Sequence, residues 1–394
     1  MTKSKRYIVF GSPYIGQDEI KEMVKTLKSG WIGAGPKVAK FEELVSQYVG
    51  AKFGLALNSC TAGLHLSLLV CGIGQGDEVI TTPLTFCATV NAIIHSGAKP
   101  VFVDVDRETM NIDVKQIEQA ITKRTKAIMP VHLAGRPCEM DTIMRIAKKH
   151  NIFVIEDAAQ ALGSEYKGRK IGSIGDLTCF SFYVTKNIIT GEGGMVTTNN
   201  KNFADKIKIY ALHGMSKDAW KRYSDDGYKH YEVIYPGFKY NMTDMQASLG
   251  IHQIKRIEDF DKKRQKIWDL YNAGFKDLPV DLPAPFSKDI HYNKHLYTLL
   301  IDNNKCGIDR DAFMQELHRH DIGSGVHFIP VHLHKYYRER FGYKLGDYPN
   351  AEYIGERTVS LPMSAKLSRS DANRVVRAVR EVILAKVKIK ARAN

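Results

Sequence analysis

The sequence predicts an α/β fold with a mostly parallel sheet, and three observations predict it. Between residues 53 and 198, short apolar runs alternate with segments of helical periodicity. The apolar runs are typical of strands that are buried on both faces of a sheet. A proline-rich stretch over residues 278–289 then separates this region from a shorter one of mixed helices and strands.

Two helices are predicted ahead of the sheet, over residues 16–30 and 36–50. Apolar residues recur at helix spacing from Ile20 to Leu27, and each segment ends at a glycine. The turn between the two helices, GWIGAGP, is rich in glycine and carries Trp31, which we expect to be exposed.

Strands and helices then follow one another along the chain. The predicted strands are residues 53–58, 77–83, 99–105, 126–133, 152–159, 176–183 and 193–198. The predicted helices between them include residues 61–73, 86–97 and 140–151. This order is typical of an α/β domain.

The rest of the chain predicts a second, smaller domain. Residues 201–275 read as mainly helical, with a loop around residues 214–240 and one long helix over residues 242–275. We therefore expect N-terminal helices and a large α/β domain over residues 1–275, and a small α+β domain over residues 276–394.

Composition bounds the class of protein. The chain has 394 residues, 44% of them apolar and 25% charged, which is ordinary for a globular protein. Its net charge of +14 could indicate nucleic acid, a phosphorylated ligand or only a soluble surface. The basic residues are spread along the chain and no helix-turn-helix signature is present, so we expect no nucleic-acid partner.

The sequence predicts neither a membrane span nor a metal site. Uninterrupted apolar runs stay below the eighteen or so residues of a spanning helix, and the N-terminus has only a short apolar run. The six cysteines lack the paired spacing of a zinc site and the density of a disulfide scaffold. We expect reduced thiols and a cytoplasmic protein.

Lys186 lies in FSFYVTKNIITGEGG, just past a predicted buried strand and just before small residues that permit close backbone approach. A lysine has an ordinary pKa of about 10.4, so it acts as a nucleophile near neutrality only if its surroundings depress that value or it is held as an imine. Taken alone, a solvated loop lysine is the commoner interpretation.

Asp157 ends the apolar strand in IFVIEDAAQALG, at the edge where parallel sheets build ligand crevices. Its carboxylate could pair with a protonated ring nitrogen. An aspartate there, with a lysine at a later strand end, is what pyridoxal phosphate needs. The alternative for Asp157 is a helix N-cap, because AAQAL follows it.

Two further segments suit the same cofactor. In NSCTAGLHLSLL, Ser59, Thr61 and the backbone amides of Ala62 and Gly63 could bind a phosphate at a helix N-terminus, or could simply cap the helix. In TTPLTFCATVNA, Phe86 could stack on a flat cofactor, or could be a core residue. The four signals together indicate pyridoxal phosphate more strongly than any one of them.

The motifs FSFYVTKNIITGEGG, VIEDAAQALG, NSCTAGLHL and GWIGAGPK resemble those of the nucleotide-sugar aminotransferases of the DegT/DnrJ/EryC1/StrS family. The resemblance covers nearly the whole chain. It implies a fold type I pyridoxal phosphate enzyme with a mostly parallel seven-stranded sheet. HGMSKDAWKRY, FKYNMTDMQASLG, GVHFIPVH and KYYRERFGY are most similar to the branch that aminates UDP-linked 4-keto sugars.

The resemblance also implies roles for individual residues. Lys186 would form the imine with the cofactor and act as general acid and base, and Asp157 would pair with the pyridinium. The other cofactor contacts would be Phe86 as the stacking ring, Gln160 near the ring, Ser59, Thr61, Ala62 and Ser181 at the phosphate, and Asn241 from a second subunit. Substrate contacts would be Trp31, Gly33 and His327.

The implied function is transfer of an amino group from L-glutamate to a nucleotide-linked 4-keto sugar, with 2-oxoglutarate as co-product. The amino sugar would serve a cell-surface polysaccharide or lipid, and the enzyme would be a homodimer with shared active sites. One departure concerns Gln160, because the arabinose-directed enzymes carry histidine there. A 3-keto sugar, or a GDP- or dTDP-linked one, therefore stays open.

Three rival interpretations are testable. Related dehydratases replace the lysine by histidine, which Lys186 argues against. A lyase or desulfurase of similar fold would act on a free amino acid. A nucleic-acid-binding regulator would account for the charge, and would bind DNA without a cofactor spectrum. Lys221, Arg222 and Arg338 are basic candidates for binding a diphosphate, although a solvated surface position is the commoner role for each of them.

Overall fold

The computed structural model describes residues 6–285 apart from 217–230, and residues 287–393. Two helices open this part of the chain, α1 (Gln17–Ser29) and α2 (Pro36–Val49). Each ends at a glycine in the left-handed conformation, where a side chain would be strained. Pro36 opens α2 at a position that loses no hydrogen bond. The two helices predicted before the sheet are confirmed.

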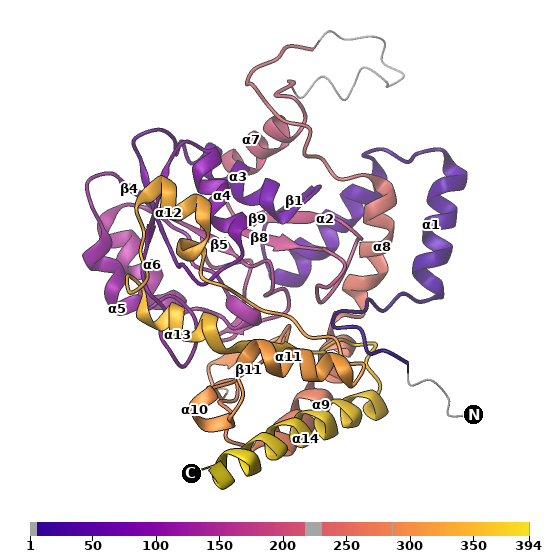
Figure 1. Cartoon of the computed structure of the whole chain (residues 1–394). Coiled ribbons are helices and arrows are strands. Elements are labelled where there is room, and N and C mark those ends of the chain that lie inside the picture. Colours follow the sequence, from indigo (N-terminus) through magenta and orange to yellow (C-terminus); the bar gives the residue numbers. More distant parts are fainter. Residues whose placement is uncertain (1–5, 217–230, 286, 394) are drawn as a thin grey trace.

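A seven-stranded sheet forms the centre of the larger part of the molecule (Figure 1). Its strands, in spatial order, are β1 (Phe53–Leu57), β9 (Gly194–Thr198), β8 (Leu177–Ser181), β5 (Phe153–Asp157), β4 (Thr125–Ile128), β2 (Glu78–Thr81) and β3 (Lys99–Phe102). The pairs from β8 to β3 are parallel, whereas β9 pairs antiparallel with both β8 and β1. The mostly parallel sheet is therefore confirmed, and β9 runs against its neighbours.

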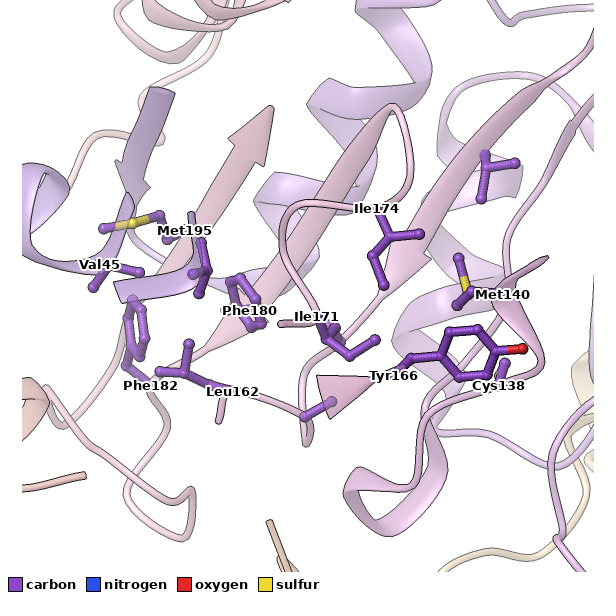
Figure 2. Packing of buried hydrophobic residues seen from close by; sticks show 14 of the residues in the cluster. Val45, Cys138, Met140, Leu162, Tyr166, Ile171, Ile174, Phe180, Phe182 and Met195 are labelled. Carbon is purple, nitrogen blue, oxygen red and sulfur yellow. The ribbon is translucent and has the colours of Figure 1, made fainter. Parts of the chain in front are cut away.

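Helices cover both faces of this sheet. The helices on one face are α3 (Cys60–Val70), α4 (Cys87–His95) and α7 (Lys201–Ala211), and those on the other are α2, α5 (Val114–Ile117), α6 (Met140–His150) and α8 (Asp244–Lys255). Neighbouring residues of one strand serve opposite layers, since Val154 packs in one core and Ile155 in the other. Figure 2 shows the core that contains Val154, on the face covered by α2, where Val45 of α2 lies beside Met195 of β9.

The C-terminal part has a core of its own. The elements of this part are α9 (Ile257–Phe275), β10 (Ile290–His291), β11 (Tyr297–Leu300), α10 (Asn303–Cys306), α11 (Arg310–Arg319), α12 (Lys335–Phe341), α13 (Pro349–Arg357), β12 (Thr358–Leu361) and α14 (Arg369–Ala393). Of these, α12 and α13 pack instead against residues of the large sheet domain. β10 joins the short hairpin of β6 (Glu165–Tyr166) and β7 (Arg169–Lys170), and β11 pairs antiparallel with β12. Figure 1 shows α9 and α14 side by side beneath the sheet domain.

Helix α9 links the two cores. Ile257 and Phe260 pack in the core beneath the large sheet, whereas Trp268, Tyr271 and Phe275 pack in the C-terminal core. The helix therefore belongs to both parts of the molecule. The domain boundary expected between residues 275 and 276 stays a prediction.

The one long helix predicted over residues 242–275 is wrong, because the chain forms two helices that meet at Arg256. This residue leaves the helical conformation at φ −110° and ψ 8°. Its guanidinium forms an ion pair with the buried carboxylate of Glu19 in α1. No glycine or proline marks the break, so tertiary contacts rather than local propensity set it.

Across the described ranges, no helix is both long enough and apolar enough to cross a bilayer. All six cysteines are free thiols, as expected.

Candidate active site

A cavity of about 420 Å³ opens where the parallel strands of the large sheet end. Asp157 and Ser181 are the last residues of β5 and β8, and Lys186 follows β8 by five positions. Residues after β1 and β2 complete this edge, and His327 reaches it from the C-terminal part. A ligand site at the carboxyl ends of the strands is the usual arrangement in α/β sheets.

Most of the residues predicted for the site line this cavity. They are Ser59, Thr61, Phe86, Asp157, Gln160, Ser181, Lys186 and His327. Four predicted residues do not line it, namely Trp31, Gly33, Ala62 and Asn241. Arg338 is exposed on α12 and also lies outside the lining, whereas Lys221 and Arg222 are outside the described residues.

Lys186 is held at the cavity wall by its own backbone, whose amide donates to the carbonyl of Tyr183 over 2.8 Å. Burial lowers the pKa of its ammonium below the ordinary value, while Cys60 and Asp157 oppose that shift. A larger fraction of neutral amine is thus present near neutrality than for a solvated lysine.

Asp157 has a donor on each carboxylate oxygen. Thr89 Oγ1 donates to Oδ2 over 2.7 Å, and the Ala159 amide donates to Oδ1 over 3.1 Å. Burial raises the pKa of Asp157, and these bonds and the nearby Lys186 counter the rise. No helix follows within the described residues 158–163, so the N-cap alternative is not what the chain adopts.

The turn predicted to hold a phosphate begins helix α3. Ser59 is the N-cap, and its hydroxyl accepts from the Ala62 amide over 3.1 Å, so that amide is already occupied. Thr61 still faces the cavity. Gly194 lies under this turn, because a Cβ built on it would come within 2.4 Å of the backbone of Ser59 and Cys60.

Phe86 and Gln160 lie on the walls of the same cavity. Phe86 precedes α4, and its ring is 59% exposed rather than buried in the core. Gln160 is oriented by its neighbours, since its side-chain oxygen accepts from the Ala134 amide over 2.6 Å. Both residues are therefore placed to contact a flat ring.

His327 reaches the cavity from the C-terminal part of the chain. Its Nδ1 is hydrogen-bonded to the buried Ser360 hydroxyl over 2.9 Å, and its ring stacks on Phe10. Burial and the proximity of Lys186 lower the pKa of His327 to about 4. The imidazole is neutral at physiological pH, so it can orient a hydroxyl group without adding charge.

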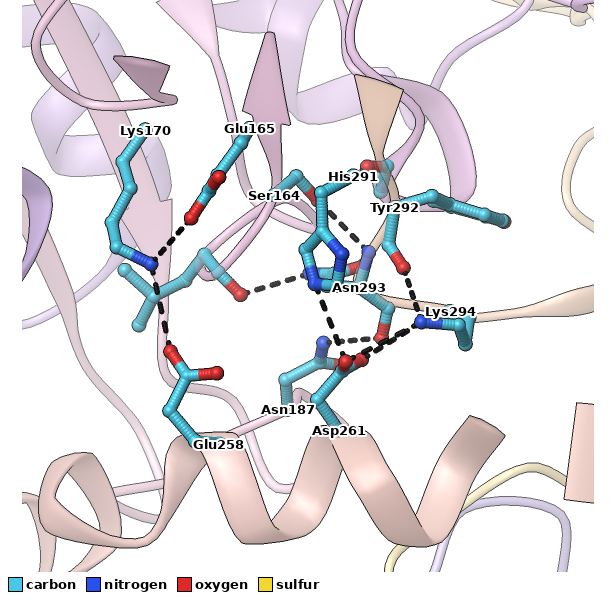
Figure 3. Close-up of polar contacts among 12 residues, drawn as sticks. Ser164, Glu165, Lys170, Asn187, Glu258, Asp261, His291, Tyr292, Asn293 and Lys294 are labelled. Atoms are coloured by element: carbon cyan, nitrogen blue, oxygen red, sulfur yellow. Dashed lines mark hydrogen bonds and ion pairs between the residues drawn. The ribbon is translucent and has the colours of Figure 1, made fainter. Parts of the chain in front are cut away.

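His295 also lines the cavity, although it was not among the residues predicted from the sequence. Its Nδ1 is 2.9 Å from the side-chain oxygen of Asn187, the residue after Lys186. Figure 3 shows how Asn187 is held, with its amide nitrogen donating to the Asn293 carbonyl. The polar run HYNKH, directly before the apolar strand at residue 297, is the signal that could have found it.

Asn293 connects the C-terminal part to the lysine loop. Its side-chain amide donates to the carbonyls of Gln160 and Leu162, and its own amide donates to Ser164 (Figure 3). One buried residue therefore joins the loop after Asp157 to the loop after Lys186.

The predicted residues outside the cavity form a second group around Asp244. The Asp244 amide donates to the Gly33 carbonyl, and its carboxylate accepts from the amides at the start of α2. Trp31 in the same turn is 57% exposed. Asn241 forms a β-bridge with Leu57, and its buried Oδ1 has no hydrogen-bond partner among the described residues.

The cavity fits pyridoxal phosphate. It offers a partly buried lysine of lowered pKa, a carboxylate at a strand end, an exposed aromatic ring and a helix N-terminus. Within the described ranges, no group of three or more His, Cys, Asp or Glu side chains could hold a metal ion.

The model of the DegT/DnrJ/EryC1/StrS aminotransferase family matches residues 13–380. The chain belongs to this family. It is 50% identical to the spore coat polysaccharide biosynthesis protein SpsC of Bacillus subtilis, over 97% of this chain and 98% of that protein.

Two solved structures of sugar-aminotransferase relatives share the fold over almost their whole length. Spr1654 from Streptococcus pneumoniae, in its PMP form, has a TM-score of 0.90 and 35% identity, covering 98% of this chain and 100% of that one. PseC of Helicobacter pylori, an aminotransferase involved in the biosynthesis of pseudoaminic acid, has a TM-score of 0.89 and 29% identity, covering 96% and 100%. The family member is thus a pyridoxal phosphate enzyme of fold type I that aminates sugars.

Proposed function

We propose that this aminotransferase moves the amino group of L-glutamate to a UDP-linked 4-keto sugar, giving a 4-amino sugar for a cell-surface polysaccharide or lipid. The observation that carries the proposal is that Lys186 and Asp157 line the same cavity. Burial there lowers the pKa of the Lys186 ammonium. The names of SpsC and PseC, which refer to polysaccharide and pseudoaminic acid biosynthesis, support the product class. A cytoplasmic location belongs to the same proposal.

When bound, pyridoxal phosphate supplies an aldehyde that carries the amino group and a ring that accepts electrons. Lys186 would hold that aldehyde and, with its amine free, would move a proton at the reacting carbon as general acid and base. Asp157 would keep a proton on the ring nitrogen, and Phe86 and Gln160 would hold the ring in place. All four side chains line the same cavity, so they could act on one bound cofactor.

The phosphate is assigned to Ser59, Thr61 and Ser181 at the start of α3 and the end of β8. The Ala62 amide, which donates to Ser59, contributes by holding that hydroxyl in place rather than by direct contact. The positive end of the α3 dipole and the cavity-facing hydroxyls favour a dianion there.

We also propose that two copies share their active sites. Trp31, Gly33 and Asn241 lie outside the cavity of their own chain, so they are free to serve a second copy. Helix α1 exposes Ile20, Val24 and Leu27 in one apolar stripe, with exposed fractions of 43% to 51%. An apolar helix face of this kind is typical of a surface covered by another subunit.

Complementation tests the shared site. The variants Lys186→Ala and Asn241→Ala are each expected to be inactive or weak. After mixed refolding, a heterodimer would combine the intact Lys186 of one chain with the intact Asn241 of the other, restoring about a quarter of full activity. If Asn241 acts within its own chain, the mixture stays as inactive as its parts.

An absorbance spectrum tests the reaction. The purified protein should show a visible cofactor band that glutamate removes with release of 2-oxoglutarate, and Lys186→Ala should lose this response. A panel of UDP-, GDP- and dTDP-linked 3-keto and 4-keto sugars then identifies the acceptor. A cofactor band that glutamate leaves unchanged would support the dehydratase or lyase alternative, and no band at all would contradict the proposal.

A further inference from the structure

Two buried threonines form a chain of hydrogen bonds that ends at Asp157. Thr89 Oγ1 donates to Asp157 Oδ2 over 2.7 Å, and Thr85 Oγ1 lies 2.7 Å from Thr89 Oγ1. The exposed fractions of Thr85 and Thr89 are 2% and 0%. Thr85 precedes Phe86, the N-cap of α4, and Thr89 lies in the first turn of that helix, so the start of α4 brings the two hydroxyls together.

The direction of this chain is fixed. A hydroxyl carries one proton, and the proton of Thr89 is given to Asp157. Thr89 can therefore only accept from Thr85, so the Thr85 proton points to Thr89. Thr85 also lines the cavity, and its oxygen offers only lone pairs to a ligand there.

The chain favours an ionised Asp157 at a site where burial opposes ionisation. Burial raises the pKa of this carboxyl, and the Thr89 bond is the largest of the contributions that lower it. A hydroxyl that is itself hydrogen-bonded is a better donor, because linked bonds polarise one another. The arrangement therefore supports the charged, acceptor form of Asp157 without placing a second charge in the cavity.

We propose that Thr89, supported by Thr85, is a positioning residue that keeps Asp157 in the ionised form needed to hold a proton on the pyridine nitrogen of the cofactor. This inference rests on the proposed function, because it assumes that Asp157 is the partner of that nitrogen. To the proposed function it adds a residue, Thr89, that influences how strongly the ring accepts electrons. Thr89 would act through its hydrogen bond to Asp157 and not by touching the cofactor.

A purely structural role is the rival explanation. A buried threonine hydroxyl that satisfies any acceptor would stabilise the fold in the same way. Thr197 provides the matched control, since its buried hydroxyl donates to the Gly172 carbonyl over 2.8 Å and is not hydrogen-bonded to Asp157.

The test compares Thr89→Val, Thr89→Ser, Thr85→Val and Thr197→Val for two properties. The first is affinity of the apoprotein for pyridoxal phosphate, measured by fluorescence titration. The second is the ¹⁵N chemical shift of bound cofactor labelled at the pyridine nitrogen, which reports protonation directly. Neither is a measurement of turnover.

Thr89→Val is expected to bind the cofactor about 10- to 100-fold more weakly, since the lost bond goes to a charged group. Its ¹⁵N resonance should move toward that of an unprotonated pyridine. Thr89→Ser should restore both properties, and Thr85→Val should weaken binding about 3- to 10-fold. Thr197→Val should match the native protein in both.

The outcomes are distinguishable. A native protein that fails to bind pyridoxal phosphate contradicts the proposed function. A native protein with a protonated pyridine nitrogen, and a Thr89→Val variant with the same shift and affinity, overturns the role of Thr89 alone. If Thr89→Val does not fold, Thr85→Val decides, because an unchanged shift and affinity in that variant overturns the role of the chain.

Discussion

His295 donates a hydrogen bond from Nδ1 to the side-chain oxygen of Asn187 over 2.9 Å, and Asn187 directly follows Lys186. The direction follows from the amide of Asn187, whose nitrogen donates to the Asn293 carbonyl and whose oxygen must therefore accept. Burial and the nearby Lys186 lower the pKa of His295 well below its ordinary value. The ring is thus neutral, and Nε2 carries the free lone pair.

The hydrogen bond from His295 to Asn187 should help to position the loop that carries Lys186. Two substitutions of His295 can test this, because one keeps a donor at the Nδ1 position and the other does not. Asparagine at position 295 can still donate from near the Nδ1 position, whereas glutamine extends too far to do so. We expect His295→Asn to keep most of the glutamate half-reaction rate and His295→Gln to lose about tenfold, comparable to one broken buried hydrogen bond. Stopped-flow loss of the visible cofactor band measures it. Equal rates in both variants would rule out the tie to Asn187.

The lowered pKa of Lys186 has a consequence for the stability of the apoprotein. Burial disfavours the ammonium, so the folded state binds this proton less tightly than the unfolded state and loses stability as the pH falls below about 10.4. Lys186→Met should therefore raise the unfolding temperature at pH 7, by about 2 °C for each kcal/mol gained.

The control is the same comparison at high pH. Above the ordinary lysine pKa the amine is neutral in both states, so the advantage of methionine should shrink. Thermal unfolding of the two apoproteins at pH 7 and at pH 11 checks this. An equal gain at both pH values would assign it to packing rather than to charge.

His327 should make the stability of the protein depend on pH in the acid range. Its pKa is lowered to about 4, so between about 6.5 and 4 the unfolded chain takes up a proton that the folded chain does not. Stability is therefore lost as the pH falls through this window. His327→Gln removes the titrating group and should flatten the decrease in urea midpoint between pH 6.5 and 4. A native profile that is already flat there would contradict the lowered pKa.

Asp244 should affect substrate affinity more than chemistry. Its carboxylate accepts from the Lys37 and Val38 amides over 3.1 and 2.9 Å, and its amide donates to Gly33 over 2.6 Å. Asp244→Asn weakens the attachment of the turn that carries Trp31. We expect KM for the keto sugar to rise about five- to tenfold with kcat nearly unchanged, and stability to fall by about 1 kcal/mol.

The control for that prediction is Asp309→Ala, which removes a helix cap at a cost of about 1 kcal/mol. Asp309 also caps a helix, since its carboxylate accepts from the Ala312 amide over 2.8 Å at the start of α11. It should cost similar stability without changing KM. A parallel rise of KM in both variants would mean that general destabilisation, rather than the turn, is responsible.

Much of the cavity could be predicted because its residues sit at predictable places in a simple architecture. Asp157 ends a strand and Lys186 follows one, and the carboxyl ends of parallel strands meet at one edge. Alternation of apolar runs is a local property, so it reveals strands even where nothing is known of their partners. The turn at Ser59 could also be predicted, because it directly follows a strand and precedes a helix.

The contacts that orient those residues could not be predicted. Thr89 looks like any helical threonine until the fold places it beside Asp157, 68 positions later in the chain. His295 contacts Asn187 across 108 positions, and Arg256, where the helix breaks, forms an ion pair with Glu19. Each of these contacts joins residues far apart in the sequence, and the periodicity of apolar residues within a short window carries no information about such contacts.

Gly194 shows how a residue can govern a site without facing it. The first residue of β9 lies so close to Ser59 and Cys60 that even a methyl group would overlap their backbone. The absence of a side chain at Gly194 therefore lets the turn at Ser59 lie this close to the sheet. Gly194 would not be found in a search for residues that contact the ligand. It nevertheless tolerates substitution no better than those residues do, in a redesigned enzyme or in a diverging one.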